Sequence, residues 1–217
     1  MTTITDDPTV ADFTRPDPAL VARLAALPAA NIGDAMDRLG VADSAIQAIW
    51  PGARLAGPAF PVWVRAGDNQ GIHRALTLAQ PGDVIVVAGQ GDTTRALLGE
   101  LIGERAISAG IAGFALDGAA RDAQVLREIG MPVFAKATTP AGPYKHGPSR
   151  IVVPVAFGGV PVLPGDIVLG DSDGLVIVPQ AQAEQIVQAA EAVFADEEQR
   201  RTSIVASRAQ APAPARI

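Results

Sequence analysis

Arg121 and Asp122 stand side by side shortly after an apolar run that is typical of a buried strand. Functional residues of α/β folds commonly follow such a strand. The guanidinium of Arg121 can bind a carboxylate through two hydrogen bonds. The carboxylate of Asp122 can hold Mg²⁺ while water or substrate fills the remaining positions. The pair therefore indicates a site for a metal ion and a carboxylate substrate. The alternative is a structural ion pair in which Asp122 caps the following helix.

A glycine-rich segment, residues 89–94, lies between a predicted strand and a predicted helix. It nearly matches the dinucleotide-binding fingerprint, with Thr94 in place of the third glycine. In that interpretation Asp117, after the next strand, is the candidate acid for the ribose. The alternative is an ordinary strand-to-helix turn. If Gly99 breaks the helix predicted to follow, the backbone amides of residues 100–102 form an anion site.

The chain has two histidines and no cysteine, which excludes several kinds of site. Without cysteine there is no disulfide, thiolate metal site, iron–sulfur cluster or cysteine nucleophile. Two histidines are too few for a three-histidine zinc site, and there is no HExxH motif and no GxSxG motif of a serine hydrolase. His73 follows Asp68 closely, near the start of a predicted helix, and we expect it to support a site.

Length and charge limit the class of protein. The 217 residues suit one sizeable domain. The net charge of −6 argues against a nucleic-acid partner, which needs a basic face. No apolar run approaches the roughly 20 residues that span a membrane, and acids stand where a signal peptide carries lysines. We therefore expect a cytoplasmic domain over residues 1–200, followed by a loose C-terminal tail over residues 201–217.

Helices and strands alternate early in the chain, whereas closely spaced strands fill the C-terminal half. This order predicts an α/β fold, namely a layered single domain and not a doubly wound sheet. Pro-Gly-Asp at residues 81–83 and again at 164–166 predicts a turn before a strand. Residues 137–150 predict a long surface loop. We expect helices over residues 17–27, 32–39 (ended by a left-handed Gly40), 71–79, 93–109, 122–129 and 181–199, and strands over residues 59–64, 84–88, 111–116, 133–136, 151–156, 160–163, 167–169 and 175–178.

These segments form an ordered series of blocks that covers roughly residues 28–180. The blocks are residues 31–38, 67–73, 80–84, 91–92, 99–100, 117–122, 132–136, 142–148, 164–166 and 171–174. In that order they resemble the family of regulator of ribonuclease activity A-like (RraA-like) proteins and 4-hydroxy-4-methyl-2-oxoglutarate aldolases. Members of that family often carry the misleading name dimethylmenaquinone methyltransferase.

The resemblance implies a β/β/α swivelling-type domain that assembles as a homotrimer or as a homohexameric dimer of trimers, with active sites between subunits. It implies that Asp122 holds a divalent cation, Mg²⁺ or else Mn²⁺ or another. It also implies that Arg121 meets the carboxylate and developing enolate of a pyruvate-like substrate. We expect His73 and Asp117 to support this site. Backbone amides of one segment are implied to bind the substrate carboxylate: Gly99, Glu100, Leu101 and Ile102.

The implied activity is that of a metal-dependent (class II) lyase, which cleaves a small 2-oxo mono- or dicarboxylic acid to a pyruvate enolate. The aldolases carry an acidic residue three positions after the aspartate, where this chain has Val125. An apolar side chain cannot organise water around a metal, which disfavours the aldol half of the activity. Decarboxylation of oxaloacetate needs no base at that position.

Two other functions stay open. One is a non-catalytic regulator that binds a ribonuclease or another protein partner. The other is a methyltransferase, which needs a site for S-adenosylmethionine, and residues 89–91 are the candidate for it.

Overall fold

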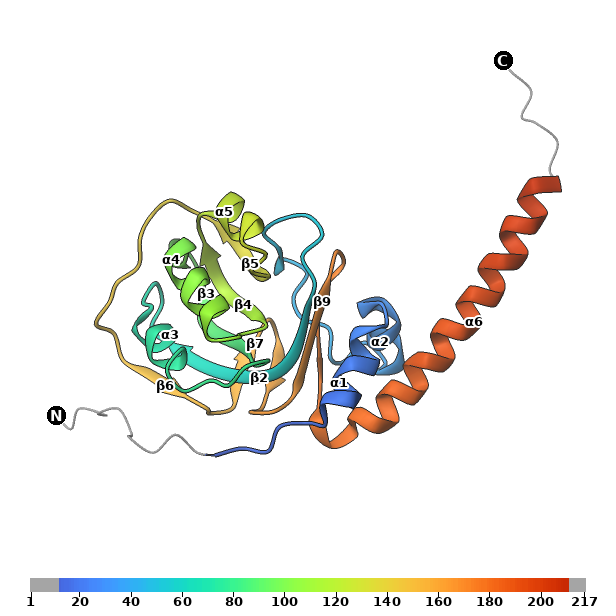
Figure 1. Ribbon diagram of the computed structural model, residues 1–217, viewed down its shortest axis with the longest axis horizontal. Coiled ribbons are helices and arrows are strands. Elements are labelled where there is room, and N and C mark those ends of the chain that lie inside the picture. Colours follow the sequence, from blue (N-terminus) through green and yellow to red (C-terminus); the bar gives the residue numbers. More distant parts are fainter. Residues whose placement is uncertain (1–11, 211–217) are drawn as a thin grey trace, which may run out of the picture.

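A mostly parallel sheet forms the centre of the domain (Figure 1). The structure is a computed structural model, and it describes residues 12–210. In spatial order the strands are β1 (Gln47–Ala48), β5 (Val133–Thr138), β4 (Gly113–Ala120), β3 (Val84–Leu98), β2 (Leu55–Val64), β9 (Ile167–Asp171) and β10 (Gly174–Val178), and β6 (Ser149–Ile151) also pairs with β2. Strands β2 to β5 are parallel. Most of their residues are buried, which explains their nearly continuous apolar sequences.

Three helices cover one face of this sheet (Figure 1). They are α3 (Gln70–Ala75), α4 (Glu100–Ser108) and α5 (Ala123–Glu128). Successive strand residues point to opposite faces, so Ile85 and Val87 of β3 face the helices and share a core with Ile72, Ile102 and Leu126. This packing places the first residues of α4 and α5 close to the carboxyl ends of β3 and β4, which they directly follow in the chain.

The opposite face of the sheet packs against a two-stranded hairpin, β7 (Val155–Phe157) and β8 (Val160–Val162). Val84 and Val86 of β3 alternate with the residues that face the helices and share a second core with Phe157 of the hairpin. The layers are therefore a hairpin, a sheet and helices. The predicted mixed α/β single domain is confirmed.

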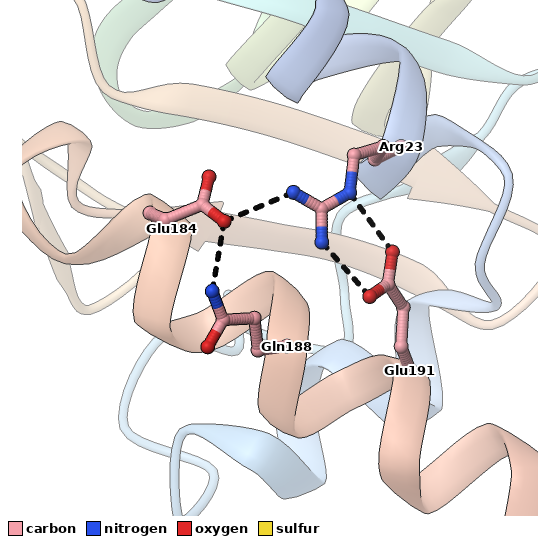
Figure 2. Close-up of polar contacts among 4 residues, drawn as sticks. All are labelled: Arg23, Glu184, Gln188 and Glu191. Atoms are coloured by element: carbon pink, nitrogen blue, oxygen red, sulfur yellow. Dashed lines mark hydrogen bonds and ion pairs between the residues drawn. The ribbon is translucent and has the colours of Figure 1, made fainter.

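The first two helices and the start of the last helix pack together beside β9 and β10. The elements there are α1 (Pro18–Ala25), α2 (Ala29–Ala35), the 3₁₀ turn η1 (Gln180–Gln182) and α6 (Ala183–Gln210). Ile32 and Val187 share a third core in this region. Figure 2 shows Arg23 of α1 donating to Glu191 at 3.0 and 2.9 Å and to Glu184 at 3.0 Å. These pairs are solvent-exposed, so they orient the long helix more than they stabilise it.

Several local predictions are confirmed. The side chain of Asp17 caps α1. Both Pro-Gly-Asp sequences form turns directly before a strand, with Gly82 at φ +91° and Gly165 at φ +88° in the left-handed region that favours glycine. In each turn the following aspartate is buried and accepts a hydrogen bond from the amide three residues earlier, at 2.8 Å for Asp83 and 2.8 Å for Asp166. Each carboxylate therefore closes its own turn.

The helix predicted over residues 93–109 is wrong in its first half. β3 continues to Leu98, and α4 begins only at Glu100. The β-branched residues Thr93 and Thr94 are better suited to a strand than to a helix. Gly99 then takes an extended conformation and separates the two elements. The break that the sequence suggested at Gly99 is therefore confirmed.

The predicted end of the second helix is also wrong. α2 ends at Ala35, and Asp37 and Arg38 have positive φ while Gly40 does not. A Cβ on Gly40 would lie 2.5 Å from the carbonyl oxygen of Ile177. Glycine stands at this position because the backbone of β10 approaches it closely, and not because it caps a helix.

The last helix is longer than predicted. α6 continues past residue 199 to Gln210, with Asp196 and Arg200 paired one turn apart at 2.6 Å. Residues 201–210, expected to be loose tail, are therefore helical, and residues 211–217 lie outside the described residues. The far part of α6 points away from the sheet (Figure 1). Within residues 12–210, no helix is both long enough and apolar enough to cross a membrane.

Candidate active site

Two strand-to-helix junctions lie side by side at the carboxyl ends of β3 and β4. Leu98 of β3 pairs with Ala120 of β4, and the backbone amide of Arg121 donates to the carbonyl oxygen of Leu98 at 3.0 Å. α4 follows the first junction and α5 follows the second. Parallel strands therefore bring the start of α4 against Arg121 and Asp122, at the edge where α/β folds commonly bind ligands.

The carboxylate of Asp122 links the two junctions. Its Oδ2 accepts a hydrogen bond from the backbone amide of Glu100 at 3.0 Å and lies 3.4 Å from Nε of Arg121. Asp122 therefore caps α4 and makes no side-chain capping bond to α5, which corrects the alternative derived from the sequence. The ion pair in that alternative is present. Oδ1 of Asp122 has no partner among the described residues, and the side chain is 36% exposed.

Asp122 also has an unusual backbone. Its φ of 57° and ψ of 35° lie in the left-handed region, which aspartate tolerates better than most residues. Such conformations cost free energy and concentrate at functional sites. The exposed carboxylate, the left-handed backbone and the neighbouring Arg121 together favour a chemical role for this turn.

Gly99 explains why the two junctions approach so closely. A Cβ on Gly99 would overlap Oδ2 of Asp122 and would lie 2.8 Å from Cγ and 3.0 Å from Nε of Arg121. Its own backbone is extended, so the requirement for glycine here comes from space and not from φ. Any side chain at this position would displace the Asp122 carboxylate.

The first turn of α4 leaves one backbone amide for a ligand. The amide of Glu100 is bonded to Asp122, and the amide of Ile102 bonds back to the carbonyl oxygen of Gly99 at 3.2 Å. The amide of Leu101 has no partner within residues 12–210, and its side chain is 75% exposed. The helix N-terminus favours an anion. The predicted anion site therefore depends most on the backbone amide of Leu101.

The loop over residues 139–148 forms the third side of the site. A Cβ on Gly142 would lie 3.5 Å from Nη1 of Arg121. Nη1 of Arg95 donates to the carbonyl oxygen of Gly142 at 2.9 Å, and the Arg95 guanidinium lies 4.1 Å from the centre of the Tyr144 ring. Two guanidinium groups therefore flank the same glycine.

Asp68 fastens the far end of this loop. Its side chain is 1% exposed. Its Oδ2 accepts from the amides of His146 (3.1 Å) and Gly147 (2.6 Å) and from Arg65 (3.1 Å), while Oδ1 accepts from the amide of Gln70 (2.9 Å). The segment predicted as a surface loop is therefore tied to the start of α3 by a saturated buried carboxylate.

Asp117 lies on β4 but is engaged elsewhere. Nζ of Lys136 lies 2.7 Å from Oδ1 of Asp117 and 3.4 Å from Oδ2 of Asp43. The hydrogen bond to Asp117 is the main cause that raises the pKa of Lys136. The Lys136 ammonium group is therefore engaged by two carboxylates. Among the described residues, no hydrogen bond or ion pair joins Asp117 to the Arg121 turn.

His73 lies at the other end of α4. Its Nδ1 is 3.0 Å from Nη1 of Arg105, in the last turn of that helix. Burial lowers the pKa of His73, and the positive charges of Arg105 and Lys145 lower it further. Within the described part of the chain, no hydrogen bond joins His73 to Asp68 or to the Arg121 turn. The structure therefore does not bring this expected supporting residue into contact with the site.

The donor set fits a hard divalent cation held by one protein carboxylate. Mg²⁺ is usually bound through one or two carboxylates, with water and substrate oxygens as its other ligands. Asp122, whose side chain is 36% exposed, offers Oδ1, which has no partner within residues 12–210. No group of three potential metal ligands exists among residues 12–210. Val125 is half-buried on α5 and supplies no oxygen, so the residues fit an ion whose shell is completed by the substrate and water.

Neither interpretation of the glycine-rich segment, as a dinucleotide fingerprint or as a strand-to-helix turn, is confirmed. Residues 89–94 lie inside β3, where Gln90 and Gly91 have positive φ and disturb the pairing with β4. No helix begins until Glu100. Without a helix N-terminus directly after the glycines, there is no cradle for a pyrophosphate. The same finding removes the candidate site for S-adenosylmethionine.

Sequence reasoning missed Arg95 and Tyr144. Arg95 lies within the helix that was wrongly predicted over residues 93–109. That prediction gave no indication that its side chain lies near the Arg121 turn. The usable signal was the β-branched pair Thr93 and Thr94 just before it, which favours a continuing strand. The contact between Arg95 and Gly142 spans 47 residues and has no signature in the sequence.

Comparisons with known proteins agree with this architecture. The RraA-like (Aldolase/RraA) family model matches residues 29–177. A protein of Halalkalibacterium halodurans named putative 4-hydroxy-4-methyl-2-oxoglutarate aldolase is 40% identical over 178 residues, which cover 82% of this chain and 85% of that protein. The 4-hydroxy-4-methyl-2-oxoglutarate aldolase of Thermus thermophilus is 38% identical over 113 residues, or 52% of this chain and 69% of that protein.

A solved structure of an RraA family member has a similar fold. Streptomyces coelicolor RraAS2, described as an unusual member of the RNase ES inhibitor RraA protein family, has a TM-score of 0.77 and 34% identity, over 88% of this chain and 98% of that chain. The matches of the family model, of the sequence and of the fold lead to one conclusion. The chain belongs to the RraA-like family.

Proposed function

We propose that the protein is a divalent-metal-dependent lyase that cleaves a small 2-oxo dicarboxylic acid and releases pyruvate. The observation that carries this proposal is the junction of Arg121 and Asp122 with the first turn of α4. It combines a cation with a carboxylate oxygen and a Leu101 amide that have no partner in the described part of the chain. The names of two similar proteins, both 4-hydroxy-4-methyl-2-oxoglutarate aldolases, support the lyase class.

Each group has a separate role in this proposal. Asp122 holds the cation through Oδ1, while its Oδ2 stays on the amide of Glu100. A divalent cation, when bound, supplies Lewis-acid polarisation of the 2-oxo group. The amide of Leu101 binds the substrate carboxylate. Arg121 donates N–H groups to the oxygen on which negative charge develops as the enolate forms.

Val125 favours decarboxylation over aldol cleavage. Aldol cleavage requires a base that takes a proton from the 4-hydroxyl group, and Val125 offers none. Decarboxylation of oxaloacetate yields the same enolate together with carbon dioxide and needs no such base. We therefore propose oxaloacetate as the first substrate to test and 4-hydroxy-4-methyl-2-oxoglutarate as the second.

Assembly is part of the same proposal. In a single chain the site lies at the surface, with Leu101 75% exposed, so a neighbouring subunit is needed to shield it from water. We propose a swivelling-type β/β/α domain that forms a homotrimer or a dimer of trimers with sites between subunits. Light scattering coupled to size-exclusion chromatography measures the mass, and a monomer under assay conditions would contradict this part.

The experiment is an assay of pyruvate release from oxaloacetate, with Mg²⁺ and with EDTA, after subtraction of the rate caused by the metal alone. We expect metal-dependent turnover that is lost in Asp122→Ala and retained in Asp173→Ala, which removes an exposed aspartate from a turn. Equal rates in wild type and Asp122→Ala would contradict the proposal.

A regulatory role is the second candidate. It is favoured by the description of the Streptomyces coelicolor structure as a member of a ribonuclease-inhibitor family. A wild-type chain without turnover on either substrate that inhibits a ribonuclease would support this role and would remove the lyase proposal.

A further inference from the structure

Arg95 is a half-buried cation without an anionic partner among the described residues. It lies near the end of β3. One N–H group bonds the carbonyl oxygen of Gly142 at 2.9 Å, and the guanidinium stacks 4.1 Å from the centre of the Tyr144 ring. The ring and the carbonyl oxygen hold the guanidinium in place. Its other N–H groups have no acceptor within residues 12–210.

Arg121 also lies close to Gly142. Its Nη1 lies 3.5 Å from the position of a Cβ on Gly142, and its ion pair with Asp122 uses Nε at 3.4 Å. Two neighbouring guanidinium groups repel each other, and partial burial makes this repulsion stronger than in water. An anion between them would offset that cost, and a substrate with two carboxylates can meet both cations.

We propose that Arg95 is a specificity-determining residue that binds the second carboxylate of a 2-oxo dicarboxylate. This inference rests on the proposed function, because Arg121, the Leu101 amide and the cation on Asp122 are taken to hold the first carboxylate and the 2-oxo group. Gly142, whose carbonyl oxygen accepts from Arg95, adds no side chain beside Arg121. The site therefore selects dicarboxylic over monocarboxylic 2-oxo acids.

Calorimetric titration with two unreactive ligands tests this inference. In the presence of Mg²⁺, pyruvate offers one carboxylate and 2-oxoglutarate offers two. We expect wild type to bind 2-oxoglutarate more tightly than pyruvate. Arg95→Gln should weaken 2-oxoglutarate at least about tenfold, as the loss of a charged hydrogen bond predicts, and leave pyruvate within about twofold. Arg127→Gln on α5 removes an exposed cation as the matched control, and Arg95→Lys should recover part of the loss.

The outcomes distinguish a failure of the Arg95 inference from a failure of the proposed function. If Arg95→Gln weakens both ligands equally, Arg95 only positions the loop, and this inference is overturned while the proposed function stands. If Arg95→Gln weakens neither ligand, Arg95 has no role in binding, and the inference is again overturned. If wild type binds neither ligand and releases no pyruvate from oxaloacetate, the proposed function itself fails and the inference falls with it.

Discussion

The loop over residues 139–148 lies between two aspartates in very different environments. Asp68 is fully buried, and both of its oxygens are occupied by three backbone amides and Arg65. Asp122 is exposed and has a left-handed backbone, and among the described residues only its Oδ2 has a partner. A saturated carboxylate has nothing left to offer a ligand. The comparison explains why Asp68 fastens the loop and supports the proposed chemical role of Asp122.

Among variants that keep the Asp122 carboxylate, Arg121→Gln gives the largest expected effect, because it removes the cation beside Asp122. We expect kcat for pyruvate formation to fall about 100- to 1000-fold, as for the loss of one group that stabilises developing charge. The free energy of unfolding should change by less than about 1 kcal/mol, since the pair with Asp122 is exposed. Steady-state kinetics and urea unfolding measure the two quantities. A kcat within threefold of wild type would remove Arg121 from the mechanism.

Asp68→Ala should act in the opposite way, on stability first. It leaves two loop amides and the amide of Gln70 without their acceptor, and we expect a loss of about 3 kcal/mol in the free energy of unfolding. Asp92→Ala is the matched control, because within residues 12–210 the Asp92 side chain accepts hydrogen bonds only from the amide and hydroxyl of Thr94, on the exposed part of β3. We expect the control to cost less than about 1 kcal/mol. Equal losses of unfolding free energy in Asp68→Ala and Asp92→Ala would contradict the role of Asp68 in fastening the loop.

Gly99→Ala tests the contact between the two junctions. The added Cβ overlaps Oδ2 of Asp122, so we expect about 1–2 kcal/mol of destabilisation from overpacking and a roughly tenfold lower kcat/KM as the carboxylate shifts. Removing the obstructing atoms in the Gly99→Ala/Asp122→Ala double variant should restore part of the stability. Additive losses of stability in the double variant would show that the close approach is not the cause.

His73→Gln gives the smallest expected effect. The pKa of His73 lies below its ordinary value of 6.5, chiefly because of burial. Between that lowered pKa and 6.5 the unfolded chain binds a proton that the folded chain does not, so His73 makes stability rise with pH through this window. The free energy of unfolding should differ less between pH 5 and pH 7 in the variant than in wild type, by less than about 1 kcal/mol. Urea unfolding at the two pH values measures this difference. An unchanged pH profile would mean that His73 does not titrate in this window.

The sequence predicts the strands better than the loops. The apolar runs that became β2 to β5 are found because burial on both faces leaves a continuous pattern. The extension of β3 through Thr93 and Thr94 carries no such pattern, since those residues are exposed. The far part of α6 has no apolar face that could mark its end, and its charged pairs one turn apart extend it beyond residue 199.

In the candidate site, too, some residues could be predicted from the sequence and others could not. Arg121 and Asp122 are adjacent in the chain, so their residue types and their position after a strand predict them. The role of Asp122 as a cap for α4 depends on a bond across 22 residues, and the bond from Asp68 to Gly147 spans 79. Such contacts exist only after folding, which is why Arg95 was missed and why His73 was expected near a site that it does not contact.

Calorimetric titration with Mn²⁺ in the presence of oxalate, an unreactive analogue of the enolate, tests the central claim most directly. We expect one Mn²⁺ per chain in wild type and in Asp173→Ala, and at least about 100-fold weaker binding in Asp122→Ala, with all three proteins unfolding at similar urea concentrations. Unchanged Mn²⁺ affinity in Asp122→Ala would contradict the assignment of chemistry to the unsaturated carboxylate.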